Sequence, residues 1–234
     1  MATPETRVTP TTSAPSVRHQ DAVDPRDPNL LVRYSTAERL THWTVAIAYV
    51  LLFLSGLALF HPFFWWLSGL FGGGAVMRIL HPFIGVALGV SFFAYASRLL
   101  AANRMNAGDW RWVRNMFAYM NKEHGETGDT GKYNAGQKLM FWSMIAFVAA
   151  LLVSGIFIWQ PYFAPAFAAT VRRGAAVVHV VSAFVMFVGI GIHIYAAYWT
   201  KGSMQAMTRG TVPRAWAKFH HPRWYREVTS KEGR

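Results

Sequence analysis

Two histidines, His179 and His193, lie in an apolar segment, residues 175–199, that contains no formally charged side chain. A segment of this length is typical of a membrane-spanning helix, and an ionisable side chain within hydrocarbon is costly and usually marks a functional site. Fourteen residues of helix correspond to a rise of about 21 Å and leave the two side chains about 40° apart around the axis. The spacing therefore predicts two separate ligand sites on one helix face, too far apart to share one metal ion.

Three further apolar segments have the length of a membrane span: residues 40–60, 80–100 and 138–159. Together with residues 175–199 they predict an all-α integral membrane four-helix bundle formed by residues 33–203. The polar segment 1–32 is expected to be a disordered tail, and residues 204–234 a basic tail. Lys138 lies at a span end, where its side chain can extend to the membrane surface.

The distribution of basic residues predicts the orientation of the bundle. Of the 23 Lys and Arg residues, only Arg78, Arg172 and Arg173 lie in the two connections on the side away from the tails. By the positive-inside rule, both tails and the loop between the second and third spans are cytoplasmic. The net charge of +12 is therefore a topology signal and an attraction to anionic lipid, not a nucleic-acid-binding feature.

With this orientation, four histidines sort by depth into two pairs. His42 and His193 lie near the cytoplasmic side, whereas His81 and His179 lie near the outer side. A haem iron takes two axial ligands on opposite faces, which two facing helices can supply. The pairs predict an outer haem held by His81 and His179 and an inner haem held by His42 and His193. The alternative for any single histidine is a ring hydrogen-bonded to a neighbouring backbone or hydroxyl group.

The remaining residues limit these assignments. The chain has no cysteine, which excludes disulfides, iron–sulfur clusters held by this chain and covalently attached haem, so both haems would be non-covalent. His61 could compete with His81 for the outer site, but its place at an exposed helix end favours an interfacial role. Four histidines in polar segments are expected to be solvated: His19, His124, His220 and His221.

A short internal repeat links the two halves of the bundle. Leu152-Val153-Ser154-Gly155 loosely repeats Phe53-Leu54-Ser55-Gly56, and a proline follows the glycine six residues later in each case. Taken alone, this is weak evidence for a duplicated helical hairpin.

Four motifs carry a resemblance to a known family. They are Thr41-His42-Trp43, Arg78-Ile79-Leu80-His81-Pro82-Phe83, Gly131-Lys132-Tyr133-Asn134-Ala135-Gly136-Gln137-Lys138, and Trp216-Ala217-Lys218 with His220-His221-Pro222-Arg223-Trp224-Tyr225. In these motifs the chain resembles the gamma, or cytochrome b, subunit of membrane-bound formate dehydrogenase, from about residue 33 to residue 227. The N-terminal extension departs from the shorter starts expected of that family.

The resemblance implies a dihaem cytochrome b membrane anchor in the bacterial cytoplasmic (inner) membrane. Its implied partners are an iron–sulfur subunit and a molybdenum- or tungsten-pterin catalytic subunit, in which formate is oxidised. Electrons would enter at the outer face and leave through two b haems to quinone at the cytoplasmic side. The resemblance also implies a quinone pocket beside the inner haem, formed by Asn134, Gly136 and Gln137.

Other interpretations remain open at this point. Without the resemblance, residues 134–137 are best explained as a helix N-terminal cap and turn. The nearest alternative for the whole chain is the cytochrome b subunit of a nickel–iron hydrogenase, which shares the electron route but has a different donor. A different class is a haem-free membrane anchor or transporter, whose histidines would line a proton or metal path.

Overall fold

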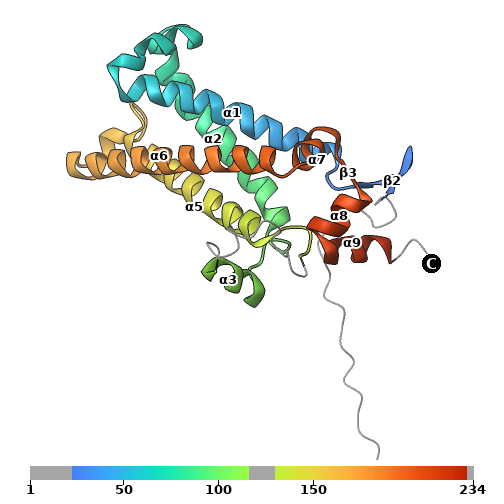
Figure 1. Cartoon of the computed structure of the whole chain (residues 1–234). Helices are drawn as coiled ribbons and strands as arrows, with labels where there is room; N and C mark the ends of the chain where they lie inside the picture. The colour runs from blue at the N-terminus through green and yellow to red at the C-terminus, as the bar shows by residue number, and fades with distance from the viewer. Residues whose placement is uncertain (1–22, 116–129, 231–234) are drawn as a thin grey trace, which may run out of the picture.

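The computed structural model describes residues 23–115 and 130–230, and its dominant elements are four long helices (Figure 1). These helices are α1 (Thr36–Phe60), α2 (Gly74–Leu99), α5 (Ala135–Ile158) and α6 (Ala169–Trp199). Each is long and apolar enough to cross a membrane. The prediction of a helical membrane bundle with four spans is therefore confirmed.

All four helices begin before the apolar runs that predicted them, and α1 and α5 each start at a capping box. Ser35 caps α1: its hydroxyl accepts from the backbone N–H of Glu38, whose carboxylate accepts from the backbone N–H of Ser35. Asn134 and Gln137 form the same reciprocal pair at α5. A capping box satisfies backbone donors that the first helical turn leaves unpaired. The polar caps thus add several residues to α1 and α5.

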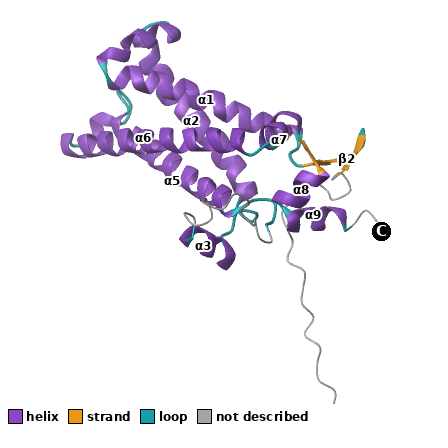
Figure 2. Ribbon diagram, in the orientation of Figure 1, coloured by secondary structure: helices purple, strands orange, loops and turns teal. Residues whose placement is uncertain are grey.

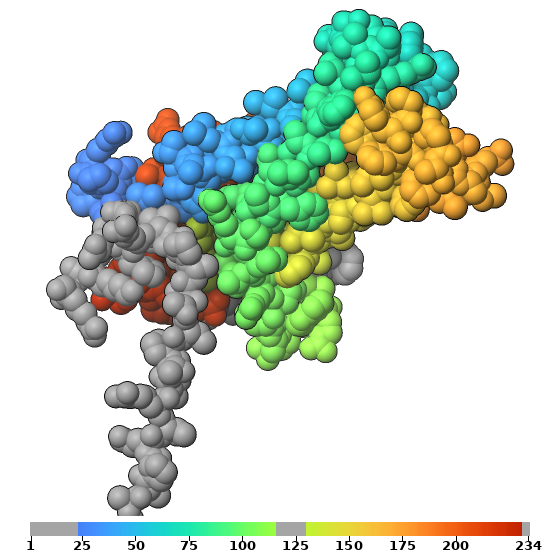
Figure 3. Space-filling model, turned by 180° about the vertical axis from the view of Figure 1, so that it is seen from behind, coloured from blue at the N-terminus to red at the C-terminus, as the bar shows by residue number. Residues whose placement is uncertain are grey.

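The helices form two hairpins that pack against each other. The 3-10 helix η2 (Pro62–Phe71) connects α1 to α2, and a turn that contains η3 (Ala164–Ala166) connects α5 to α6. Seen from behind, α2 lies across the molecule between α1 and α5 (Figure 3). We call the end where α1 and α5 begin the tail end, and the end with the two connections the hairpin end. The mid-bundle core is the cluster of Leu88, Val148 and Met186.

Outside the bundle, the described parts of the two tails fold together into what we call the terminal cap, residues 23–34 and 203–230 (Figure 2). Strand β2 (Asp27–Val32) lies between β1 (Val23–Asp24) and β3 (Thr211–Pro213) in an antiparallel sheet. Three short helices complete the cap: α7 (Ser203–Arg209), α8 (Arg214–His220) and α9 (Pro222–Thr229). Its core includes Leu31, Val212 and Trp224.

This cap corrects the expectation that the chain is disordered up to residue 32. Residues 23–32 include several polar residues, but they form strands β1 and β2, β3 pairs with Leu30–Val32, and Leu31 is fully buried. A local reading of composition cannot detect a partner strand that lies some 180 residues away. Residues 1–22 and 231–234, and with them His19, lie outside the described residues, as does His124 in the segment 116–129.

His221 is also buried, which corrects the expectation that it is solvated. Its Nδ1 lies 2.8 Å from the carbonyl oxygen of Gly131 and its Nε2 lies 3.0 Å from an Nη atom of Arg33. Burial, together with the Arg33 charge, lowers the pKa of His221 to about 3. The neutral ring therefore donates to Gly131 and accepts from Arg33, and so ties the C-terminal segment to the chain on both sides of the first two spans.

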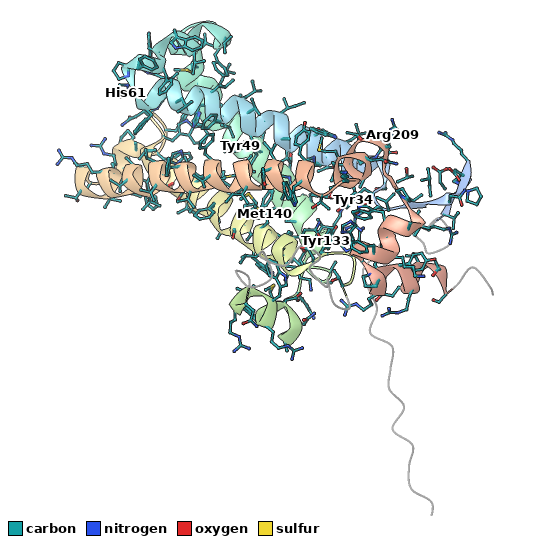
Figure 4. The ribbon with its side chains drawn as sticks, viewed as in Figure 1. Tyr34, Tyr49, His61, Tyr133, Met140 and Arg209 are labelled. Atoms are coloured by element: carbon teal, nitrogen blue, oxygen red, sulfur yellow. The ribbon has the colours of Figure 1, made fainter. Side chains whose placement is uncertain are left out.

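Aromatic rings surround the contact between Arg33 and His221. The Arg33 guanidinium lies 5.2 Å from the ring centre of Trp216 and 5.0 Å from that of Trp224, distances typical of cation–π contacts. Lys132 lies between Tyr34 and Tyr133, which Figure 4 shows at the tail end, and it also pairs with Glu38 at 3.4 Å. Two of the four motifs that carried the family resemblance, residues 131–138 and 216–225, thus meet in one junction between the terminal cap and the bundle.

Candidate functional site

The first candidate site lies toward the hairpin end, where His81 of α2 faces His179 of α6. The two ring centres are 6.4 Å apart, with an angle of 61° between the ring planes. The Nδ1 of His81 lies 2.7 Å from the hydroxyl of Ser55, and the Nδ1 of His179 lies 3.0 Å from that of Ser154. In each ring, Nε2 remains as the nitrogen that can bind a ligand.

The second candidate site lies toward the tail end, where His42 of α1 faces His193 of α6. Here the ring centres are 6.3 Å apart, and the ring planes make an angle of 48°. The Nδ1 atom of His42 is buried and has no hydrogen-bond partner among the described residues. The structure therefore brings both predicted pairs together, and α6 contributes one histidine to each.

The spacing of the rings can be compared with that of two ligands on one metal ion. An imidazole nitrogen bonds a metal at about 2.0–2.1 Å and lies about 1.1 Å from its ring centre, so two imidazoles on opposite sides of an ion have centres about 6.3 Å apart. The observed separations of 6.3 and 6.4 Å agree with this value. Both pairs therefore fit axial ligation of an iron.

The number of ligands at each site indicates what kind of metal group fits. Within residues 23–115 and 130–230, no three His, Asp or Glu side chains come close enough to hold a metal ion between them. A structural zinc ion needs four protein ligands, whereas haem brings four nitrogens of its own and needs at most two from the protein. Two imidazoles in an apolar bundle are thus a donor set suited to haem.

An aromatic stack separates the two sites. Phe53 of α1 and Phe187 of α6 lie parallel, with ring centres 4.6 Å apart and an angle of 2° between their planes. Phe187 falls between His179 and His193 on α6. The sites are therefore kept apart by packed apolar groups.

The predicted quinone-pocket residues form the first turn of α5 at the tail end. The amide oxygens of Asn134 and Gln137 accept backbone hydrogen bonds of 2.8 and 3.0 Å within the capping box. Both side chains are exposed, and neither amide nitrogen has a hydrogen-bond partner among the described residues. An atom added as Cβ to Gly136 would lie 3.5 Å from the Trp112 ring. The capping interpretation is correct, and it leaves two N–H donor groups available.

The sequence did not predict how α3 (Ala107–Arg114) is held against this turn. Lys138, at the start of the third span, is buried: its ammonium group forms a 2.7 Å ion pair with Asp109 of α3 and donates to the carbonyl of Arg104. Trp142, one turn further along α5, donates to the carbonyl of Asn103. No local signal in the sequence pairs Lys138 with Asp109, because the two lie in separate segments.

Comparison with known proteins gives the family of the chain. The family described as prokaryotic cytochrome b561 matches residues 33–210, which cover all four long helices and both histidine pairs. The chain belongs to this family. Haem b is the cofactor that this family implies, which agrees with the two-imidazole sites.

Individual relatives agree with the resemblance found in the sequence motifs. The chain is 48% identical over 198 residues to the formate dehydrogenase cytochrome b556(fdo) subunit of Escherichia coli K12, covering 85% of this chain and 93% of the relative. It is 41% identical over 205 residues to the nitrate-inducible cytochrome b556(Fdn) subunit of the same organism, covering 88% and 94%. A formate dehydrogenase cytochrome b556 subunit of Haemophilus influenzae is 39% identical over 202 residues, covering 86% and 85%.

Each of the two histidine pairs is expected to hold one haem. We expect His81→Ala and His179→Ala each to lose the hairpin-end haem and retain the tail-end haem, and His42→Ala and His193→Ala to do the reverse. The measurement is haem per chain in the purified variants, together with the reduced-minus-oxidised spectrum. His61→Ala is the matched control: His61 accepts a backbone N–H from Phe63 at the start of η2, so this variant should keep both haems. Loss of only the tail-end haem in His81→Ala would show that the pairing is wrong.

Proposed function

We propose that this chain is the dihaem cytochrome b subunit of a membrane-bound formate dehydrogenase and carries electrons across the membrane to quinone. The observation that carries the proposal is the pair of two-imidazole sites at different depths, each with the ring spacing that an axially ligated iron requires. Haem, when bound, supplies an iron that accepts and releases one electron. The names of the relatives favour formate over hydrogen as the ultimate electron donor.

The proposed roles of the protein side chains follow from their positions. His81 and His179 hold the outer haem, and His42 and His193 hold the inner haem. The apolar bundle excludes water from both sites and fixes the distance between them through α6. Neither site holds a residue that could oxidise formate, so an iron–sulfur subunit and a molybdenum- or tungsten-pterin subunit would supply electrons at the outer face.

The basic residues favour one orientation of the bundle in the membrane, and this orientation sets the direction in which electrons would carry charge. The tail end carries most of the Lys and Arg side chains, which favours its placement on the cytoplasmic side. Electrons that travel from the hairpin end to the tail end then move negative charge inward. If the full membrane is crossed, each electron works against about 2.3 kcal/mol per 100 mV of outside-positive potential. The chain would therefore conserve energy as membrane potential.

The first turn of α5 is the proposed quinone pocket. A quinone carbonyl is a hydrogen-bond acceptor, so the site needs donors. The capping box occupies the side-chain oxygens of Asn134 and Gln137, which leaves their NH2 groups for this purpose. Gly136 lies between them on the same turn and lacks a side chain that would restrict access. Water at the cytoplasmic surface would supply the protons.

Formate should reduce the haems when the partner subunits are present. In the purified complex, we expect formate to produce a b-type reduced spectrum that is reoxidised on addition of a quinone analogue. Hydrogen gas serves as the control donor and should leave the spectrum oxidised. Reduction by hydrogen and not by formate would support the hydrogenase alternative, and a purified complex without b-type absorption would overturn the cytochrome assignment.

The quinone pocket can be tested separately from the helix cap. Asn134→Asp retains the oxygen that accepts from the Gln137 backbone but lacks the NH2 donor, and Asn134→Ser is a neutral variant that also retains a capping oxygen. Both should slow quinone reduction several-fold while both haem spectra stay unchanged. Asn134→Ala should show the same kinetic defect and, in addition, about 1 kcal/mol of lost helix stability. If the Asp and Ser variants reduce quinone at the wild-type rate, Asn134 acts only as a helix cap.

A further inference from the structure

We infer that Ser55 and Ser154 are positioning residues for the axial histidines of the hairpin-end site: each accepts Nδ1–H from the histidine of the following helix and so directs Nε2 toward the shared centre. The inference rests on the proposed function, in which His81 and His179 bind haem iron. Nothing comparable is present at the tail-end site among the described residues. The two haems would therefore differ in the hydrogen bonding of their ligands.

The position of the hydrogen follows from the contacts of each serine. The Ser55 hydroxyl lies 2.8 Å from the carbonyl oxygen of Leu51 and 2.7 Å from Nδ1 of His81. A hydroxyl has one hydrogen to donate, and a carbonyl oxygen has none. Two oxygens at 2.8 Å need that hydrogen between them, so Ser55 donates to Leu51. The contact to His81 must then be an N–H donated by the ring.

Ser154 repeats this arrangement in the second hairpin. Its hydroxyl lies 2.6 Å from the carbonyl oxygen of Ala150 and 3.0 Å from Nδ1 of His179. Both serines are almost fully buried, with relative exposures of 1% and 4%, so water cannot easily replace either hydroxyl. With Nδ1 protonated, each neutral ring has its lone pair on Nε2, which is the form that binds a metal.

The adjacent glycines show that the two halves share one local geometry. A Cβ built on Gly56 would lie 3.5 Å from Cε1 of His81, and a Cβ built on Gly155 would lie 3.5 Å from Cε1 of His179. In each hairpin, the first helix presents Ser-Gly and the second helix presents the histidine against it. The short sequence repeat therefore has a physical explanation: it supplies the same support to the two ligands of one site.

The tail-end pair lacks this support. His42 and His193 have no serine partner among the described residues, and the buried Nδ1 of His42 has no partner there at all. When the ring nitrogen that does not bind the metal donates its N–H to an acceptor, the hydrogen bond fixes the orientation of the imidazole and makes it a stronger electron donor to the metal. Stronger donation stabilises oxidised iron. Removal of the serine acceptors should therefore raise the potential of the hairpin-end haem and leave that of the tail-end haem unchanged.

The test is a redox titration of the purified complex with Ser55→Ala, Ser154→Ala and the double variant, followed by optical and electron paramagnetic resonance spectra. We expect one haem to shift to higher potential in each single variant and further in the double variant, with Ser→Thr at either position restoring the lower value. Ser97→Ala is the matched control, because Ser97 makes only an intrahelical bond to Ala94 on α2. It should leave both potentials unchanged.

The outcomes separate this inference from the proposed function. Wild-type complex without two b haems would overturn the proposed function itself. Two haems with unchanged potentials in the double alanine variant, or a shift confined to the tail-end haem, would overturn only the positioning role. If an alanine variant loses the hairpin-end haem, the threonine variant at the same position separates the two possible causes. Retention of the haem by the threonine variant supports the hydroxyl as the cause. Equal loss shows that the serine acts through packing alone.

Discussion

Burying imidazole rings inside an apolar bundle costs free energy, and the structure has to offset this cost. Each ring has two nitrogens that lose hydrogen bonds to water when they are buried. At the hairpin-end site, a serine hydroxyl is the hydrogen-bond partner of Nδ1 in each ring, which leaves Nε2 of each ring for a ligand. In the proposed function, a bound haem iron would take up these two nitrogens. The long, continuous α6 then sets the depth of both sites, because it carries one histidine of each.

A second constraint is the anchoring of the helix ends, where the chain meets water. The capping boxes at α1 and α5 define where two spans begin. The Arg33–His221–Gly131 network joins the terminal cap to the loop before α5, and the Lys138–Asp109 ion pair fixes α3 beside the same loop. These contacts converge around the turn that carries Asn134 and Gln137. If the proposed quinone site is there, these contacts would hold its two amide donors in place.

Much of this could be predicted from the sequence, because the relevant signals are local. Apolar length gave the four spans, and helical geometry with the basic residues gave the histidine pairs. The terminal cap, the buried His221 and the Lys138–Asp109 pair were missed because each joins segments far apart in the chain. The Ser-Gly repeat was visible, but its meaning required knowing which histidine faces each serine. Composition also misled for residues 23–32, which form strands β1 and β2 and pair with β3 through Leu30–Val32.

The proposed function places two irons in this bundle, one between each pair of histidines. A cryo-electron microscopy map of the complex, at a resolution that shows side chains, would test this placement. We expect two porphyrins, one with iron between the Nε2 atoms of His81 and His179 and one with iron between the ligating nitrogens of His42 and His193. A map with only one porphyrin, or with a porphyrin ligated by any other side chain, would overturn the assignment.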